Sequence, residues 1–139
     1  MTRVDFYVVE DASSEARLQV AARLAEKAYR QGHSLFINAG SASEAEAIDE
    51  LLWTFRPGSF IPHHALTESL QGPVVVGWGQ EPNNHDDVLI NLALTPPAFF
   101  SRFQRVAEVV TQDTTALEAM REAWRFYKDR GYPLQKHDL

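Results

Sequence analysis

The chain has 139 residues, of which 45% are hydrophobic, and it contains no cysteine. This length predicts a single domain over residues 1–139 with a sizeable core, and the lack of cysteine excludes disulfides, thiolate catalysis and cysteine-based metal sites. The net charge of −6 disfavours a protein that binds nucleic acid with its whole surface. Because the N-terminus lacks a signal-peptide pattern, we expect a cytoplasmic protein.

The first third of the chain alternates predicted strands and helices. Residues 4–9 form a short apolar run that is typical of a buried strand. Residues 14–31 carry apolar side chains at helical spacing, and Gly32 follows where a helix usually ends. Residues 34–38 predict a second strand, and a capping-box pattern from Ser41 to Glu44 predicts the start of a second helix.

In the rest of the chain the predicted strands follow one another more closely. We expect strands at residues 60–62, 73–78 and 88–93, a short helix at 98–102, and a last strand at 106–110, where a continued helix is the alternative. The last helix is expected to begin at the capping box Thr115–Glu118 and to end at Gly131. This order predicts an α/β protein, a three-layer α/β/α sandwich of Rossmann-like type. Its sheet should be largely parallel and twisted, with room for an antiparallel edge strand.

The loops lack the motifs of a catalytic or nucleotide-binding site. Residues 10–14, after the first strand, contain two acids and no glycine, so we expect no phosphate-binding loop. His63 and His64 are neighbours in an extended segment and should point to opposite faces, which disfavours a shared metal. The loop His85–Asp87 could hold a cation, but such residues are more typical of a solvated turn. We therefore expect no catalytic residue, no metal and no cofactor.

The last predicted helix has an apolar face with a basic margin. On a helical wheel Met120, Trp124 and Tyr127 share the apolar arc, while Arg121 and Arg125 lie beside it. An aromatic floor with a guanidinium rim suits a peptide that ends in an apolar residue and a free carboxylate, which arginine can bind through two parallel hydrogen bonds. The alternative is that the two arginines pair with the helix neighbours Glu118 and Glu122 on a solvated face.

A second candidate surface lies in residues 48–63, where a predicted helix gives way to a turn and a strand. Trp53 and Phe60 place large rings at this junction, and such rings often anchor a partner protein. Periodicity alone is equally consistent with their being core residues.

Several segments of the chain resemble one protein family, the chi subunit of bacterial DNA polymerase III. They are Phe6 in the opening strand, Asp49–Trp53, Ser59–His63, residues 73–78, Asp87–Leu92 followed by Pro97–Phe100, and Arg121–Tyr127. The segments around Trp53 and His63 are the most specific. The resemblance covers nearly the whole chain.

This resemblance implies a non-enzymatic accessory subunit of the replicative polymerase holoenzyme. Members of the family join the clamp loader, through the psi subunit, to the C-terminal tail of the single-stranded-DNA-binding protein (SSB). The tail site implied for this chain comprises Val110, Arg121, Trp124 and Arg125, with Arg121 as the main carboxylate ligand. Trp124 stands where the family often has tyrosine.

The resemblance also implies a psi-binding surface at Trp53, Phe60, Pro62 and His63, for which a helicase competes in some members. Such a protein senses DNA through the protein that coats it, so we expect no direct contact with nucleic acid. Two other functions stay open. One is a small α/β enzyme with a metal or nucleotide site near His85–Asp87, and the other is an RNA-associated domain.

Overall fold

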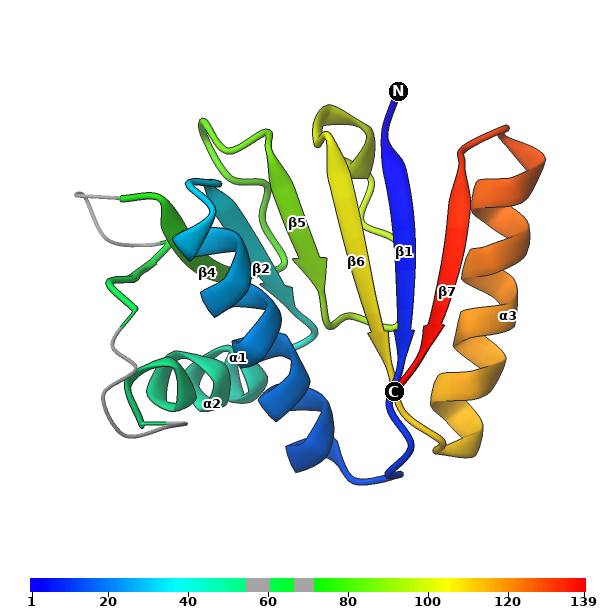
Figure 1. Ribbon diagram of the computed structural model, residues 1–139, viewed down its shortest axis with the longest axis horizontal. Helices are drawn as coiled ribbons and strands as arrows, with labels where there is room; N and C mark the ends of the chain where they lie inside the picture. Colours follow the sequence, from blue (N-terminus) through cyan, green and yellow to red (C-terminus); the bar gives the residue numbers. More distant parts are fainter. Residues whose placement is uncertain (55–60, 67–71) are drawn as a thin grey trace.

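The computed structural model describes residues 1–54, 61–66 and 72–139, and in these ranges strands and helices alternate except for the successive strands β3, β4 and β5 (Figure 1). The strands are β1 (Arg3–Val8), β2 (Leu35–Ala39), β3 (His64–Ala65), β4 (Val74–Trp78), β5 (Val88–Asn91), β6 (Arg105–Val110) and β7 (Leu134–Asp138). The helices are α1 (Ser14–Arg30), α2 (Ala42–Thr54), the short 3-10 helix η1 (Phe100–Arg102) and α3 (Thr114–Asp129).

The described strands form one seven-stranded sheet in the order β3-β4-β2-β5-β6-β1-β7. Each pairing among them is parallel, so the expectation of an antiparallel edge strand is wrong. The reason lies in the connections. Residues 79–87 and 92–104 carry the chain back to the opposite end of the sheet, whereas an antiparallel pair would be joined by a short hairpin turn.

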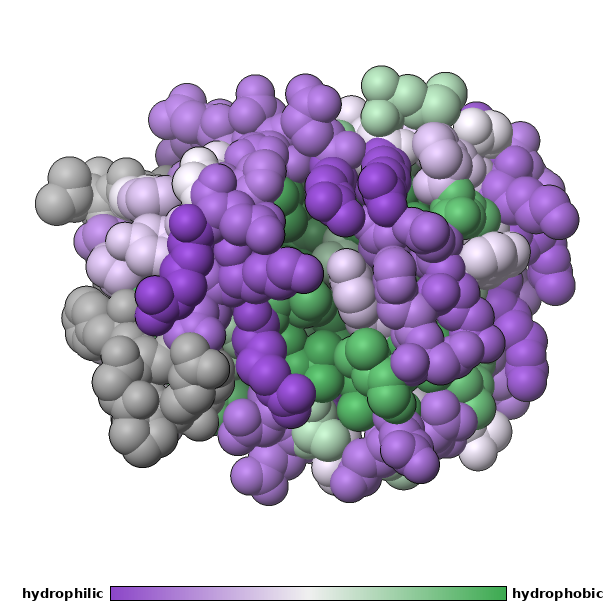
Figure 2. All heavy atoms as spheres, viewed as in Figure 1, coloured by the Kyte–Doolittle hydropathy of each residue, from purple (hydrophilic) through white to green (hydrophobic). Residues whose placement is uncertain are grey.

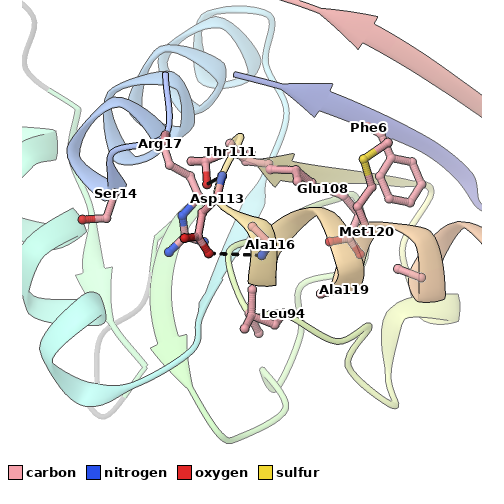
Figure 3. A pocket seen from close by; sticks show the side chains of 15 residues that line it. Phe6, Ser14, Arg17, Leu94, Glu108, Thr111, Asp113, Ala116, Ala119 and Met120 are labelled. Carbon is pink, nitrogen blue, oxygen red and sulfur yellow. Dashed lines mark hydrogen bonds between the residues drawn. The ribbon is translucent and has the colours of Figure 1, made fainter. Parts of the chain in front are cut away.

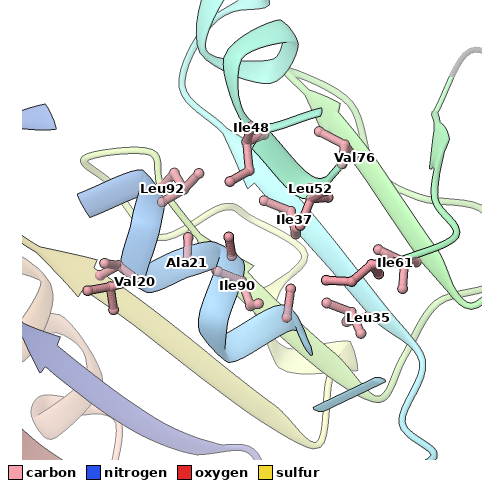
Figure 4. Close-up of a cluster of buried hydrophobic side chains, with 14 of the residues drawn as sticks. Val20, Ala21, Leu35, Ile37, Ile48, Leu52, Ile61, Val76, Ile90 and Leu92 are labelled. Carbon is pink, nitrogen blue, oxygen red and sulfur yellow. The ribbon is translucent and has the colours of Figure 1, made fainter. Parts of the chain in front are cut away.

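Helices cover both faces of the sheet, which confirms the predicted three-layer arrangement. On one face α1 and α2 pack against the strands through a cluster of aliphatic side chains (Figure 4). Leu35 and Ile37 of β2 point into this cluster, while Phe36 between them belongs to a second cluster on the other face. That second cluster includes side chains of α3 and is rich in aromatic rings.

Local signals set the ends of the long helices. The Ser13 side chain accepts a hydrogen bond from the backbone N–H of Ala16 at the start of α1, and Gly32 follows its end with φ of 87°. Gly131 plays the same part after α3, with φ of 80°. The predicted cap of α3 at Thr115 is wrong, because Asp113 caps this helix by accepting from Ala116 N–H. Its carboxylate also suits the positive end of the helix dipole.

Several short elements differ from the sequence-based expectations. Of the strand expected at residues 60–62, residue 60 lies outside the described residues, and the next two are not in a strand; β3 begins later, at His64. Pro62 explains part of this shift, because it has no N–H to donate to a neighbouring strand. The expected helix at 98–102 is the single turn η1. The strand expected at residues 106–110 is confirmed as β6, over residues 105–110, whereas β7 was not predicted at all.

Candidate functional site

The predicted tail-binding residues on α3 lie on the side of the helix next to β1 and β7. The Trp124 ring is half-buried and packs on Phe6 of β1, with ring centroids 5.2 Å apart. One turn before it, Arg121 is exposed. The indole is thus fixed against the sheet by its inner face, while the guanidinium group beside it remains in solvent.

The two arginines of this margin differ in their partners. The guanidinium group of Arg125 lies 3.4 Å from the Glu122 carboxylate, and both side chains are well exposed. Within the described residues Arg121 forms no ion pair with Glu118 or with any other acid. Of the two intrahelical pairs considered as an alternative, only the one at Arg125 forms. Arg121 is therefore the cation of this margin that is available to an external carboxylate.

β7 adds a cation that the sequence alone did not indicate. Lys136 is the pairing partner of Phe6 in the parallel register of β1 and β7, and Phe6 is the residue on which Trp124 packs. Side chains of residues paired in this way lie on the same face of a sheet, so Lys136 flanks the indole from the strand side. Its ammonium group lies 3.4 Å from the carboxylate of Asp138. We call Arg121, Trp124, Arg125 and Lys136 the α3–β7 surface.

Val110, the fourth predicted tail residue, is buried at the end of β6 and lines a neighbouring pocket of about 260 Å³ (Figure 3). The pocket opens at the C-terminal edge of the sheet, between the first turns of α1 and α3. Phe6 and Met120 also line it, whereas Arg121 and Trp124 do not. The four predicted residues therefore do not line one cavity. Phe6 is the link between them, because it lines the pocket and also supports Trp124.

A buried polar network holds α3 against the sheet beside this pocket. Glu108 of β6 accepts hydrogen bonds from the Tyr127 hydroxyl, at 2.6 Å, and from the Asn91 side chain, at 2.9 Å. Asn91 in turn accepts from Asn38 of β2 at 3.0 Å. The network joins three strands to α3. The strand pattern did not reveal it, because a single glutamate in an apolar strand has no spacing signal.

Burial changes the titration of the two acidic groups of this network. Desolvation raises the pKa of Glu108 to about 7, although the hydrogen bonds from Tyr127 and Asn91 act in the opposite direction. Desolvation also raises the pKa of the Tyr127 hydroxyl, and the nearby Glu108 charge raises it further. The pair therefore carries at most one negative charge, on Glu108.

The predicted psi-binding residues that are described lie at the end of α2 and in the segment that follows. Trp53 is 42% exposed and Pro62 is exposed, whereas the His63 side chain is fully buried. The rings of Trp53 and His63 lie 4.3 Å apart. Phe60, the other predicted residue, lies outside the described residues. His63 thus supports the indole from below, and Trp53 and Pro62 form the exposed part of this surface.

The contacts of His63 fix its orientation. Its Nδ1 atom donates to the Ile61 carbonyl oxygen at 2.7 Å, because a carbonyl can only accept. Its Nε2 atom lies 3.1 Å from an Asp49 carboxylate oxygen, but the direction is not that of a hydrogen bond. His64 turns elsewhere and accepts from the backbone N–H of Gly72. The two neighbouring histidines face different partners, as the extended segment predicts.

The loop His85–Asp87 does not bring its polar side chains together. The Nε2 atom of the buried His85 donates to the Gly72 carbonyl oxygen, and Asp87 contacts His33 at 3.0 Å and the backbone N–H of Ser34. Asp86 is exposed. Across the described ranges no group of three His, Asp or Glu side chains is placed to hold a metal ion. The same part of the chain has no helix that is both long and apolar enough to cross a membrane.

The chain matches proteins of one family along almost its full length. The model of the family "DNA polymerase III chi subunit, HolC" matches residues 1–135. The chain is 48% identical over 139 residues to the DNA polymerase III subunit chi of Pseudomonas aeruginosa, which covers 100% of this chain and 98% of that protein.

Two more distant relatives carry the same name, DNA polymerase III subunit chi. The Haemophilus influenzae protein is 28% identical over 137 aligned positions, which cover 96% of this chain and 95% of that protein. The Escherichia coli protein is 26% identical over 141 aligned positions, 96% of each. Matches of this extent to the family and to its named members show that the chain belongs to the DNA polymerase III chi subunit family, the accessory subunits of a replicative polymerase.

Proposed function

We propose that this chain is a non-enzymatic adaptor that links the clamp loader, through the psi subunit, to the C-terminal tail of SSB. Such an adaptor works in the cytoplasm and holds the polymerase holoenzyme on coated single-stranded DNA. The psi subunit binds at Trp53 and Pro62, and a helicase can compete for the same surface. The tail binds on the α3–β7 surface.

The observation that carries the tail-binding proposal is the exposed Arg121 beside the half-buried Trp124. A chain end with an apolar side chain can pack on the indole and place its carboxylate at the guanidinium group. Acidic residues farther from that end are attracted by Arg125 and Lys136. A short contact of this kind is expected to reach micromolar affinity, about −8 kcal/mol, and to weaken as salt is added.

Replacement of Arg121 by alanine tests this site. We expect the variant to bind a peptide of the last SSB residues more weakly by about 1.5–3 kcal/mol, the scale of a charge-assisted hydrogen bond. Isothermal titration of the peptide into both proteins measures the difference. Arg23→Ala removes another exposed arginine, from α1 on the other side of the sheet, and should leave the affinity unchanged. Equal affinities for wild type and Arg121→Ala would refute the proposed tail site.

The contribution of β7 to tail binding can be tested with two substitutions in this strand that should change the peptide affinity in opposite directions. Lys136→Gln should weaken peptide binding about two- to fivefold, the range of one exposed ion pair. Asp138→Asn should strengthen it by a similar factor, because it releases Lys136 and removes a negative charge that faces an acidic tail. The same titration measures both. Damage to the strand would weaken binding in both variants, so changes of the same sign would contradict the assignment.

A further inference from the structure

The face of the sheet opposite α3 is only partly covered. α1 and α2 lie over β2, β4, β5 and part of β6, and among the described residues no helix crosses in front of β1 and β7 (Figure 1). Alternate side chains of β6, β1 and β7 point out of this face, and most of them are polar or charged. They are Arg3, Asp5 and Tyr7 of β1, Arg105, Ala107 and Val109 of β6, and Gln135 and His137 of β7.

A buried carboxylate organises the cations of this face. Asp5 is only 2% exposed, and its oxygens lie 3.1 Å from the Arg105 guanidinium group and 3.0 Å from Nε2 of His137. Arg3 lies 3.7 Å away. Burial alone would raise the pKa of Asp5, but the hydrogen bonds from His137 and Arg105 and the nearby arginine charges lower it. One ionised carboxylate thus fixes two arginines and a histidine side by side, and the arginine side chains remain about half exposed.

The same face carries a stacked pair of aromatic rings. The rings of Tyr7 and His137 are stacked, with centroids 4.7 Å apart and planes 14° from parallel. His137 keeps about a third of its side chain exposed, and Tyr7 is half-buried. Because the stack stands among the cations that Asp5 holds, an aromatic surface and a positive rim occupy one site.

A groove leads from this stack to α1. It has a volume of about 130 Å³, and Asp5, Tyr7 and Arg105 form its strand side. Lys27 and Gln31 stand on its helix side. Figure 2 shows apolar residues at the bottom of the hollow and hydrophilic residues along its rim. Lys27 and Arg105 line the groove, and Arg3 lies beside it near Asp5. Against the single negative charge of Asp5, these three cations give the site a positive local charge, opposite to the net charge of the chain. The other acid nearby, Asp87, is paired with His33 at the end of the groove.

We infer that this groove, lined by β5, β6, β1 and α1, together with the adjacent Tyr7–His137 stack, binds a short stretch of single-stranded nucleic acid directly. Bases stack on aromatic side chains of a sheet face, and their phosphates require cations at the rim; Tyr7 with His137 and Arg3 with Arg105 and Lys27 supply these two elements. An acidic peptide would use the cations but not the rings. The groove and the α3–β7 surface lie on opposite faces, so a strand and a tail can be held together. The inference does not rest on the proposed tail binding.

Fluorescence anisotropy of a labelled oligo-dT with the full chain tests the inference. With three phosphate contacts, affinity should fall roughly 20-fold between 50 and 200 mM salt, a slope of about −2. Tyr7→Val, which suits a strand but removes the ring, should weaken binding at least about fivefold. Lys27→Gln, on an exposed helix position, should weaken binding and reduce the slope by about 0.7. A thermal unfolding scan confirms that each variant is folded.

Lys128→Gln is the matched control, because it removes one exposed positive charge from α3 on the other face. This variant should bind the oligonucleotide as wild type does. Equal losses for Lys27→Gln and Lys128→Gln would overturn the site and indicate general charge attraction. An absence of binding by wild type at low salt would also overturn it. A third result would overturn it as well: Tyr7→Val binds the oligonucleotide with unchanged affinity, and poly-glutamate displaces the oligonucleotide. That result would assign the groove to acidic peptides.

Discussion

The Glu108→Gln variant is expected to lose a pH dependence of stability that the wild-type chain shows between about pH 4.5 and 7. The pKa of Glu108 rises from its ordinary value of 4.5 to about 7 in the folded chain. Between these values the unfolded chain has released the proton and the folded chain still holds it, so the free energy of unfolding falls as the pH rises. A pKa difference of this size lowers the free energy of unfolding by about 3 kcal/mol. This loss is reached near pH 7 and stays constant above it.

Glutamine at position 108 has no proton to lose and keeps an acceptor for the Tyr127 hydroxyl. Relative to wild type, the variant should therefore gain up to about 3 kcal/mol between pH 4.5 and pH 8. Urea unfolding at a series of pH values measures this difference, and contributions from other groups such as Asp5 cancel in it. Glu118→Gln, on the exposed side of α3, is the matched control and should show no such trend. A difference between Glu108→Gln and wild type that is constant across the range would show that Glu108 titrates as an ordinary glutamate.

The second large effect is expected from Trp53→Ala. If Trp53 is an anchor of the psi-binding surface, its loss should weaken capture of the psi subunit by more than about 2 kcal/mol, roughly 30-fold, as is typical of a tryptophan hot spot. The fold should tolerate the change, because the side chain is 42% exposed and packs on His63 rather than in the core. Surface plasmon resonance with immobilised psi subunit measures the loss.

Two comparisons make this result specific. Trp78→Ala removes another exposed tryptophan, at the end of β4, and should leave psi capture intact. Binding of the SSB tail peptide to Trp53→Ala should equal that of wild type, because α3 lies on the other face of the sheet. Loss of psi capture and tail binding together would show that the variant is misfolded. Loss of psi capture by both tryptophan variants would contradict the assignment to the end of α2.

Much of the fold could be predicted because its signals are local. Apolar periodicity located α1, and the glycines at positions 32 and 131 marked the ends of α1 and α3. Buried parallel strands such as β2 and β4 read as continuous apolar runs. β7 carries no such run: it lies at the edge of the sheet, and after Leu134 its side chains are polar or charged and at least partly exposed. Its strand conformation depends on pairing with β1, which no local pattern reveals.

In the candidate sites too, the residues placed by a local pattern could be predicted, and those placed by strand pairing could not. The basic margin of α3 follows from helical spacing, so Arg121 and Trp124 could be placed beside one another without a structure. Lys136 could not, since its position next to Trp124 depends on the register of two strands more than a hundred residues apart. The buried state of His63 was also hidden, because an extended segment does not indicate which of two neighbours faces inward. Tertiary pairing, rather than residue type, decides these positions.

The parallel pairing of β7 with β1 gives this edge strand two separate tasks. Lys136 faces α3 and His137 faces the opposite side, where it stacks on Tyr7. A displacement of the strand by one position would exchange the two side chains and disable both faces at once. The turn from Gly131 to Pro133 sets this alignment, with the Pro133 carbonyl bonded to Val4. This turn should therefore tolerate amino-acid substitutions better than insertions or deletions, because only the latter change its length.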